Sequence, residues 1–489
     1  MARHSDAAGD VELWRSDGSA LGTGRLTDIG SAPGSSMMSR IVPSASRQIG
    51  YFSAFQSTTG YELWRTDGSI AGTQAIIDLA PGASSGVPAD GLGSFNDPAR
   101  SGTLGERLLF VGSDGTSGAE PWITDGSMLG TVKLAETLAG NNGLSTGPEH
   151  FAALGESAYF LARTSISTAF LKRVFRTDGT AAGTVELSIP ADATRFIGPW
   201  IAAIGTLFIA GVRASDGEEL WRINAAGDGL EPVTDLAAGT ASTSIRGGIA
   251  VGGGATGNNL LFAAAQQTRG VELFVSDGSA AGTLPLPDLA PGFSGSLSEL
   301  LPDPQANARS RNTVRFGARV FYACDPDGQG GLEPCTRDGT AAGTGRLLDF
   351  EPGAAGSFPV EPVSDGTRVW FIATQAGERA VHVTDGSIGG TTSLNETRGI
   401  TPEAMALLPN GELVMSGNLT LGASEFGREL FAGEPGAIRG FNLAACELSS
   451  NPGNVVRIGD FAVFRANTGA AGNEPHVYRP ERIFAGGYE

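Results

Sequence analysis

The stretch Asp325–Glu333, with the sequence DPDGQGGLE, carries the acidic residues whose spacing best suits a metal ion. Asp325 and Asp327 stand two positions apart, a Gly follows, and Glu333 comes six positions after Asp327. Carboxylate oxygens at such spacings are typical ligands of Ca²⁺. The stretch departs from the EF-hand pattern and no flanking helices are expected, so a long polar hairpin is the competing interpretation. Calcium is therefore the candidate cofactor, with Asp325, Asp327 and Glu333 as candidate ligands.

Sequence patterns for other common kinds of catalysis are missing. The His residues lie far apart and form no zinc-binding pair, and the chain has no nucleophile elbow or Walker loop. They are His4, His150, His382 and His476. The sequence therefore assigns no catalytic residue and no organic cofactor. An active site assembled from separate strands would leave no local pattern, so an enzyme stays open as an alternative.

A short motif, Asp-Gly-Ser/Thr-x-x-Gly-Thr, recurs along the chain. Its Asp can cap the backbone amides of a tight turn, and the Gly after it can adopt the positive φ that such a turn needs. A ring of cation sites is the alternative, but a ligand site is normally single, so the repetition favours a structural turn. The Asp residues of the motif are Asp17, Asp67, Asp125, Asp178, Asp277, Asp338 and Asp385.

Most copies of this turn follow a segment that opens with Glu, then Leu or Pro, then an aromatic residue, as at Glu62 and Glu120. A carboxylate in an apolar strand needs hydrogen-bond donors, which the amides of neighbouring turns can supply. Trp64 and its equivalents recur at one strand position, which indicates packing between repeats rather than ligand binding. Trp200 and Trp370 lie off that position and could line a binding face.

Around these motifs, apolar runs of strand length alternate with polar turns. Arg107–Ser113 and Asn259–Ala265 are typical of buried strands, and no segment has the pattern of an amphipathic helix. From Glu12 to Glu474 the repeat recurs about every 51 residues, which holds three clear antiparallel strands and a weaker fourth. The repeat predicts an all-β fold, a β-propeller of about nine or ten four-stranded antiparallel blades. Two tandem smaller propellers are the alternative.

Because the repeat covers nearly all of residues 1–489, we expect a single repeat-built propeller domain. The sequence begins almost at once on an ELW segment, at Glu12, and its last repeat closes soon after Glu474–Tyr478. Propellers often complete one sheet from both ends of the chain, which removes an exposed edge. The N- and C-terminal strands are therefore expected to complete one blade together.

The chain has three cysteines. Cys324 and Cys335 flank a polar stretch that can form a hairpin, so their side chains can meet in a disulfide. Cys446 then has no partner, and we expect it to be buried and inert.

The formal net charge of −19 argues against a nucleic-acid partner and against binding to anionic membranes. No run of about 18 apolar residues is present, so no membrane insertion is expected. The opening residues, MARHSDAAGDVELW, lack the apolar stretch of a signal peptide. We therefore expect one of two cases: the protein is intracellular, or its signal peptide lies outside this sequence.

The recurring ELWRTDGSIAGT pattern resembles the ELWxxDGT-repeat proteins, a hyalin-repeat-like group of bacterial secreted and surface proteins. The resemblance covers about Glu12 to Glu474, and the seven strict turn motifs carry it. It implies a secreted or cell-surface location and a role in adhesion, binding or assembly. The chain departs from the pattern where LWRINAAGDGLEP replaces the turn, and in its last three repeats.

These observations favour a non-enzymatic extracellular binding or assembly module, whose blade loops hold a protein or glycan partner and which can form part of a larger surface structure. A polysaccharide lyase or hydrolase with its site in the central funnel is the alternative. That enzyme would require carboxylates, His or Tyr that converge from separate blades. A calcium-stabilised structural spacer is a third reading.

Overall fold

The computed structural model describes residues 2–5, 11–15, 24–25, 42–44, 46, 48–88, 100–138, 147–165, 172–236, 243–252, 259–266, 270–288, 313–326, 328–329, 331–340, 345–421, 424–441, 453–458, 461–467 and 473–478. The chain divides into two compact units, residues 1–242 and 243–489, and each is described by itself. The expectations of a single domain and of a blade completed by both chain ends stay predictions.

Within the described residues the strands form ten antiparallel sheets, eight of four strands and two of three. In each sheet the strands follow one another in chain order, so every connection within a sheet is a hairpin. This is the repeating unit of a β-propeller, and the all-β propeller fold expected from the repeat is confirmed. The part of the chain that the structure describes contains no α-helix, and it has no helix long and apolar enough to cross a membrane.

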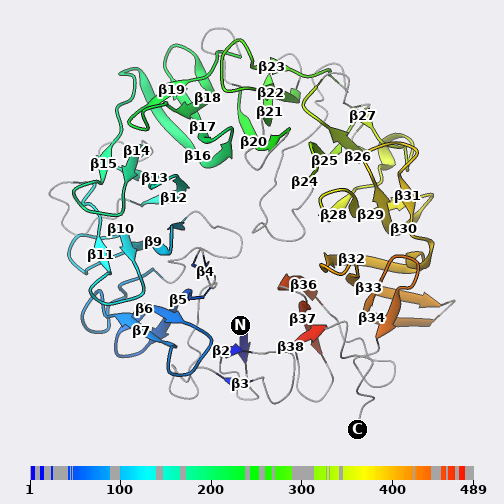
Figure 1. Ribbon diagram of the computed structural model, residues 1–489, viewed down its shortest axis with the longest axis horizontal. Helices are drawn as coiled ribbons and strands as arrows, with labels where there is room; N and C mark the ends of the chain where they lie inside the picture. The colour runs from blue at the N-terminus through cyan, green and yellow to red at the C-terminus, as the bar shows by residue number, and fades with distance from the viewer. Residues whose placement is uncertain are drawn as a thin grey trace. The chain divides into compact units, whose positions relative to one another are not determined.

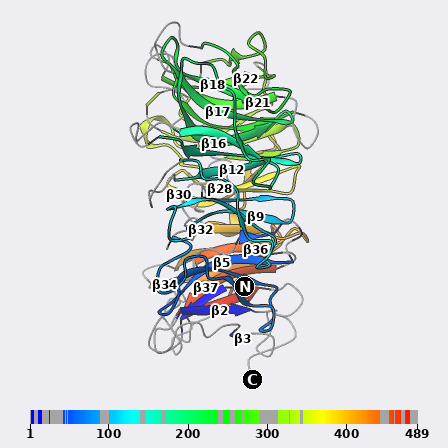
Figure 2. The ribbon, with the colours of Figure 1, turned by 90° about the vertical axis from the view of Figure 1, so that its left-hand side faces the viewer.

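In the first unit, three sheets cover the chain up to residue 133 (Figure 1). Their strands are β1 Ala2–Ser5, β2 Val11–Arg15, β3 Gly24–Arg25; β4 Val42–Pro43, β5 Gly50–Gln56, β6 Gly60–Thr66, β7 Gln74–Ile77; β8 Ser101–Leu104, β9 Arg107–Gly112, β10 Glu120–Thr124 and β11 Val132–Lys133. Two further sheets complete the unit, and Figure 2 shows strands of the second of them in succession. Their strands are β12 Glu149–Leu154, β13 Ser157–Arg163, β14 Lys172–Thr177, β15 Val185–Glu186; β16 Ala193–Ala203, β17 Thr206–Arg213, β18 Gly217–Ile223 and β19 Leu230–Pro232.

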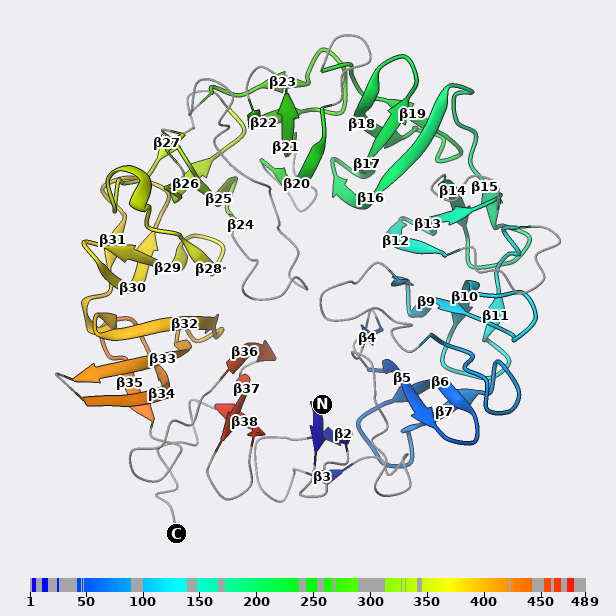
Figure 3. The same cartoon turned by 180° about the vertical axis from the view of Figure 1, so that it is seen from behind.

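The second unit holds five sheets, seen from behind in Figure 3. The first three contain β20 Ile245–Val251, β21 Asn259–Gln266, β22 Gly270–Ser276, β23 Leu284–Pro285; β24 Thr313–Phe316, β25 Arg319–Cys324, β26 Glu333–Arg337, β27 Gly345–Arg346; β28 Val360–Ser364, β29 Val369–Gln375, β30 Glu378–Thr384 and β31 Thr392–Ser393. The last two contain β32 Ile400–Leu407, β33 Leu413–Leu421, β34 Ser424–Gly433, β35 Arg439–Phe441; β36 Gly453–Ile458, β37 Phe461–Asn467 and β38 Asn473–Tyr478. Two short 3₁₀ helices, η3 Gly353–Ala355 and η4 Asn395–Thr397, lie in connections.

The core lies between neighbouring sheets, because the middle strands are apolar on both faces. In the first unit, Phe160 of β13 stacks between Phe151 of β12 and Phe175 of β14, with ring centroids 5.2 and 5.4 Å apart. Leu109 of β9 joins the same buried cluster from the preceding sheet. Burying one such side chain contributes about 2 to 3 kcal/mol, so each pair of neighbouring sheets holds itself together.

The first strand of several sheets carries a β-bulge, an extra residue that breaks the ladder and redirects side chains. In β12 the bulge lies between Glu149 and Ala152, and in β28 between Val360 and Val363. Strand β32, which lies beside β28 in the second unit, has its bulge between Pro402 and Ala404. These bulges place polar side chains that a regular strand would point elsewhere.

Candidate functional site

The repeated Asp residues lie in their own turns. Asp67 Oδ1 accepts hydrogen bonds from the Ser69 amide at 2.8 Å and from the Ser69 hydroxyl at 2.7 Å. These bonds from Ser69 hold the pKa of Asp67 below its usual range. The same pairing of Asp with the Ser or Thr two positions later occurs at Asp125, Asp178, Asp277, Asp338 and Asp385. Asp17 lies outside the described residues. A carboxylate engaged in this way serves its turn rather than a ligand.

The Glu residues that open the third strands anchor the backbone of the segment that follows the sheet. Glu62 accepts hydrogen bonds from the Leu79 amide at 3.0 Å and the Gly86 amide at 2.8 Å. The side chain is 2% exposed, and burial outweighs these donors, raising the pKa of Glu62 to about 7. Glu120 and Glu219 bind backbone amides in the same way. These carboxyl groups are engaged by the backbone and anchor their repeats.

The calcium candidates do not gather around a common point in the described part of the stretch. Glu333 uses both carboxylate oxygens on the backbone amides of Phe350 and Ser357, each at 3.0 Å. Asp325 accepts the Gln329 amide at 3.2 Å, and Asp327 lies outside the described residues. No group of three or more His, Cys, Asp or Glu side chains that could hold a metal ion is found among the residues that the structure describes. Calcium at this stretch stays a prediction.

The two cysteines that flank the same stretch are joined. Cys324 and Cys335 form a disulfide between β25 and β26, with their Cα atoms 6.0 Å apart. Both residues are fully buried in an apolar cluster that includes Tyr322. The disulfide therefore lies in the core of the second unit.

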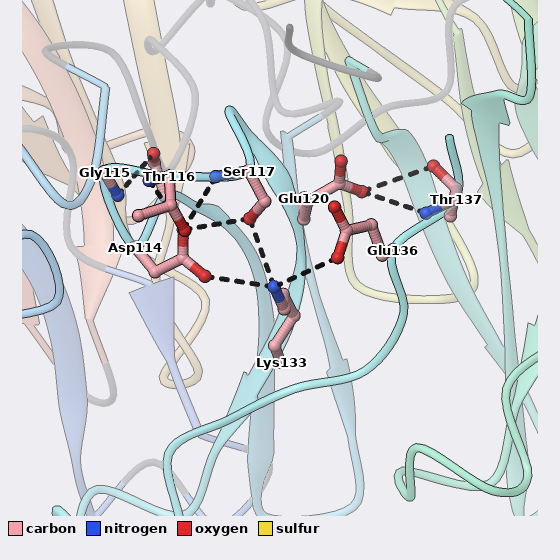
Figure 4. Close-up of polar contacts among 9 residues, drawn as sticks. Asp114, Gly115, Thr116, Ser117, Glu120, Lys133, Glu136 and Thr137 are labelled. Carbon is pink, nitrogen blue, oxygen red and sulfur yellow. Dashed lines mark hydrogen bonds and ion pairs between the residues drawn. The ribbon is translucent and has the colours of Figure 1, made fainter. Parts of the chain in front are cut away.

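Figure 4 shows a dense polar cluster in the first unit, at the hairpin between β9 and β10. Asp114 Oδ1 accepts hydrogen bonds from the amides and hydroxyls of Thr116 and Ser117, at 2.7 to 2.9 Å. Asp114 Oδ2 accepts from Lys133 Nζ at 3.0 Å. The Lys133 ammonium group also donates to Ser117 Oγ at 3.1 Å and lies 3.7 Å from Glu136 Oε2.

This cluster brings a serine hydroxyl next to a lysine, the pairing that some hydrolases use to make a nucleophile. The charges oppose that chemistry. Burial alone would lower the pKa of Lys133, but its bond to Asp114 and the nearby carboxylates raise it, so the side chain stays protonated. Burial would likewise raise the pKa of Asp114, but the hydrogen bonds from Thr116, Ser117 and Lys133 hold it far below its usual range. Lys133 therefore cannot accept a proton from Ser117, and the cluster is structural.

A second lysine cluster joins Lys172 on the third strand of the next sheet, β14, to the first strand, β12. Lys172 Nζ lies 2.6 Å from Glu149 Oε1, and His150 Nε2 lies 3.7 Å from the same oxygen. His150 occupies the β12 bulge with a φ of 56°, a conformation that costs a non-glycine residue of order 1 to 3 kcal/mol. Lys133 and Lys172 are the only lysines of the sequence, and each is held by carboxylates.

The strongest candidate for chemistry is a group of four charged residues on neighbouring sheets of the second unit, which we call the carboxylate pair site. It consists of Glu361 on β28, Arg379 on β30, Glu403 on β32 and Arg428 on β34. Arg428 Nη2 lies 2.5 Å from Glu403 Oε2. Arg379 donates from Nε to the Pro402 carbonyl at 2.9 Å. Burial lowers the pKa of Arg379, and the charges of Glu403 and Glu361 oppose that effect.

Both carboxylates sit in bulges. Glu361 has a φ of 53° and is 3% exposed, so the fold holds a strained and buried acidic residue at this point. Glu403 is the extra residue of the β32 bulge, and 31% of its side chain is exposed. One carboxyl group is therefore buried, and the other meets solvent. Such pairs carry general acid and base chemistry in enzymes that cleave glycosidic bonds.

Sequence reasoning missed these residues, because Glu361 and Glu403 belong to different repeats and have no shared motif. One signal was present. Each glutamate has a Pro beside it, in Glu361-Pro362 and Pro402-Glu403. A Pro inside a strand pattern marks a bulge or an edge, so an acidic residue next to it could have been read as a redirected side chain.

The aromatic residues set apart in the sequence are mostly core. Trp370 is 5% exposed and packs in the cluster between β28–β31 and β32–β35. Trp200 is partly buried and packs edge-on against Tyr159, with ring centroids 6.2 Å apart. Neither arrangement makes an open platform for a ligand.

No family model matches the chain, and no curated protein sequence matches it. Among solved structures it is similar to a puromycin hydrolase, at 14% identity and a TM-score of 0.37, over 83% of this chain and 60% of that one. It is also similar to the β-propeller domain of the Trilobed protease from Pyrococcus furiosus, at 11% identity and a TM-score of 0.30, over 70% and 97% of the two chains. TolB from Acinetobacter baumannii matches at 11% identity and a TM-score of 0.28, over 62% and 61%. The chain thus spans about 60% of the length of the puromycin hydrolase.

These comparisons correct one expectation. The sequence favoured a non-enzymatic binding or assembly module, whereas the similar structures include a puromycin hydrolase, a puromycin-hydrolyzing peptidase and prolyl endopeptidases. At 10 to 14% identity the likeness concerns the fold alone, and the activities named belong to those proteins. The expected function is therefore replaced by the one that the charged residues of this chain support.

Proposed function

We propose that the protein is a polysaccharide hydrolase of the β-propeller type, that it acts outside the cytoplasm, and that Glu361 and Glu403 supply its acid and base. The observation that carries this proposal is the position of Glu361 and Glu403 in the bulges of β28 and β32, two strands that lie side by side, with Arg428 paired to Glu403. This is the convergence of carboxylates from separate blades that a polysaccharide-cleaving propeller requires.

The exposure of the two side chains suggests their roles. Hydrolysis of a glycosidic bond needs one carboxyl group that protonates the leaving oxygen and one carboxylate that activates water or attacks the sugar. Glu403 is the one that solvent reaches, and we assign it to the water. Glu361 is then the proton donor. The ion pair with Arg428 orients Glu403, and the bond from Arg379 to the Pro402 carbonyl fixes the bulge that presents it.

Three features support a location outside the cytoplasm. The disulfide between Cys324 and Cys335 is of a kind that persists in oxidising compartments. The net charge of −19 suits a soluble surface exposed to solvent. The ELWxxDGT-like repeat resembles proteins that are secreted or attached to the cell surface. A glycan is then the partner that the protein meets, as substrate.

The test is the release of reducing sugar ends from a panel of neutral and acidic polysaccharides by the purified chain. We expect Glu403→Gln and Glu361→Gln each to lower the rate by about 10² to 10⁴-fold, as loss of a general acid or base does. The matched control is Glu434→Gln, an exposed glutamate of the same unit outside the carboxylate pair site. Circular dichroism and melting temperature establish that each variant is folded.

The proposal is wrong if the wild-type chain releases no sugar ends from any polysaccharide, or if Glu403→Gln keeps the wild-type rate. If the chain cleaves peptides instead of polysaccharides, and both variants lose that activity, then Glu361 and Glu403 are the right residues and the proposed substrate is wrong.

A further inference from the structure

The second unit contains a buried histidine that its surroundings do not satisfy. His382 lies on β30 and stands where other repeats have an aromatic residue, such as Trp64 or Phe274. It is fully buried, and its imidazole packs against the rings of Phe350, at 4.6 Å, and Phe371, at 5.5 Å, which are 6.2 Å from each other. Neither ring nitrogen has a hydrogen-bond partner among the described residues. The backbone at Ala373 lies near enough to affect the imidazole but makes no hydrogen bond of ordinary geometry with it.

This position couples two neighbouring sheets. Phe350 belongs to the segment that leads out of the sheet β24–β27, and its amide donates to Glu333 of β26 at 3.0 Å. Phe371 and His382 pair across β29 and β30 in the next sheet. The imidazole therefore forms part of the apolar contact that holds the Phe350 segment against the β28–β31 sheet, together with Phe316 and Phe321.

No charge near His382 compensates a proton on the ring. On the neighbouring elements, Glu333 is engaged by backbone amides, Asp349 pairs with Arg346, and Glu351 accepts the Gly377 amide. Strand β29 carries no ionisable residue.

The charged residues on and just after β30 are also engaged elsewhere and do not pair with His382. On β30 itself, Glu378 pairs with Arg398, Arg379 faces the carboxylate pair, and Asp385 after the strand caps its own turn. Burial lowers the pKa of His382 to about 4; the Ala373 backbone opposes this effect and Arg398 adds to it.

We infer that His382 makes the contact between the Phe350 segment and the β28–β31 sheet sensitive to acid. A protonated imidazole cannot stay packed against two phenyl rings without a partner, because the cost of burying an unpaired charge exceeds the packing it provides. Protonation therefore ejects the ring and separates the Phe350 segment from the sheet. A neutral imidazole restores the contact.

Arg379 lies three residues before His382 on the same strand, with its side chain on the opposite face, so the consequence reaches the carboxylate pair site through the backbone of β30. Opening of this contact would shift Arg379 away from Glu361 and Glu403. This last step rests on the proposed function, whereas the opening itself does not.

The experiment is hydrogen exchange of the full chain between about pH 7 and pH 4, corrected for the intrinsic exchange rate. The amides to follow are those of Phe350 and Val381, the second of which donates to Thr397 Oγ1 at 2.9 Å. If opening binds one proton, the equilibrium constant for opening should rise about tenfold for each unit by which the pH falls between about 6.5 and about 4. The matched variant is His382→Phe, which restores the aromatic residue of other repeats and should fold.

In His382→Phe the rise should disappear at Val381, whereas the Phe350 amide keeps a weaker pH dependence because burial raises the pKa of its acceptor, Glu333. The same tenfold dependence in that variant would overturn the inference, as would an NMR titration in which the His382 imidazole takes up its proton near pH 6.5 with no change in exchange. Neither measurement depends on catalysis, so a failure here is distinct from a failure of the proposed hydrolase activity.

Discussion

The guanidinium of Arg107, at the start of β9, donates a hydrogen bond to the Gly179 carbonyl at 3.2 Å and another to the Asp178 carbonyl at 3.0 Å. Gly179 belongs to the Asp-Gly turn of the next sheet in the first unit. Arg319 makes an equivalent bond to the Gly386 carbonyl in the second unit, at 2.6 Å. An arginine of one sheet thus caps the turn of the following sheet, and these turns serve as contacts between repeats as well as reversals of the chain.

Replacement of Arg107 by Ala should lower the free energy of unfolding by about 1 to 2 kcal/mol, since it removes two hydrogen bonds and leaves two carbonyls without this donor. The measurement is urea unfolding followed by tryptophan fluorescence. Arg107→Lys should recover only part of the loss, because an ammonium group cannot match the forked geometry of a guanidinium. Equal stability of the wild type and Arg107→Ala would show that the bonds do not connect the sheets.

Glu62 should make stability depend on pH near neutrality. Its pKa is raised from an ordinary 4.5 to about 7 in the folded protein, so the folded state holds a proton that the unfolded state has released. The stabilisation is complete below about pH 4.5 and is lost as the pH rises through about 7, by about 3 kcal/mol in total. Melting temperatures of wild type and Glu62→Gln from pH 4 to pH 8 provide the measurement. The variant should lack this part of the decline, and parallel curves would count against the assignment.

Reduction of the disulfide between Cys324 and Cys335 should destabilise the second unit. The bond joins residues 11 apart, and closing a loop of that size contributes about 2 to 3 kcal/mol. Thermal unfolding with and without a phosphine reductant measures the effect. The double variant Cys324→Ser/Cys335→Ser should melt at the temperature of the reduced wild type and should not respond to reductant. A response in the double variant would assign the effect to another group.

Phe160→Ala should cost about 3 to 5 kcal/mol, because it opens a cavity between the stacked rings of Phe151 and Phe175. Phe160→Leu keeps most of the volume and should cost much less. Urea unfolding of the two variants measures the difference. If the two costs were alike, the loss would come from aromatic stacking rather than from the cavity.

The repeat made the strands, the turns and the anchoring glutamates predictable, because each depends on residues close together in sequence. The Asp67 turn is closed by Ser69, and Glu62 finds its donors in the amides of the next segment, as a carboxylate in an apolar strand requires. Repetition of the same pattern also indicated that these residues are structural. The evidence for a structural role is the recurrence of the pattern, and it does not depend on any one repeat.

The carboxylate pair site could not be predicted in the same way. Glu361 and Glu403 come together only because β28 and β32 lie side by side and each has a bulge, and neither fact follows from a local pattern. His382 is similar. The sequence shows that the usual aromatic residue is replaced, but the ring of Phe350 comes from a segment that only the packing of two sheets brings against it.

The buried glutamates have a regular feature in their partners. Glu62, Glu120, Glu219 and Glu333 each accept a hydrogen bond from the backbone amide 17 positions later, at Leu79, Thr137, Leu236 and Phe350. The hydrogen bond therefore fixes the number of residues between the glutamate and its amide in each of these repeats. A residue inserted or deleted inside this stretch would move the amide off its carboxylate. For Glu62 and Glu333 the same holds up to a second amide 24 positions after the glutamate, at Gly86 and Ser357. Loops beyond the bonded amides can lengthen, so the repeats can differ there while these hydrogen bonds stay in register.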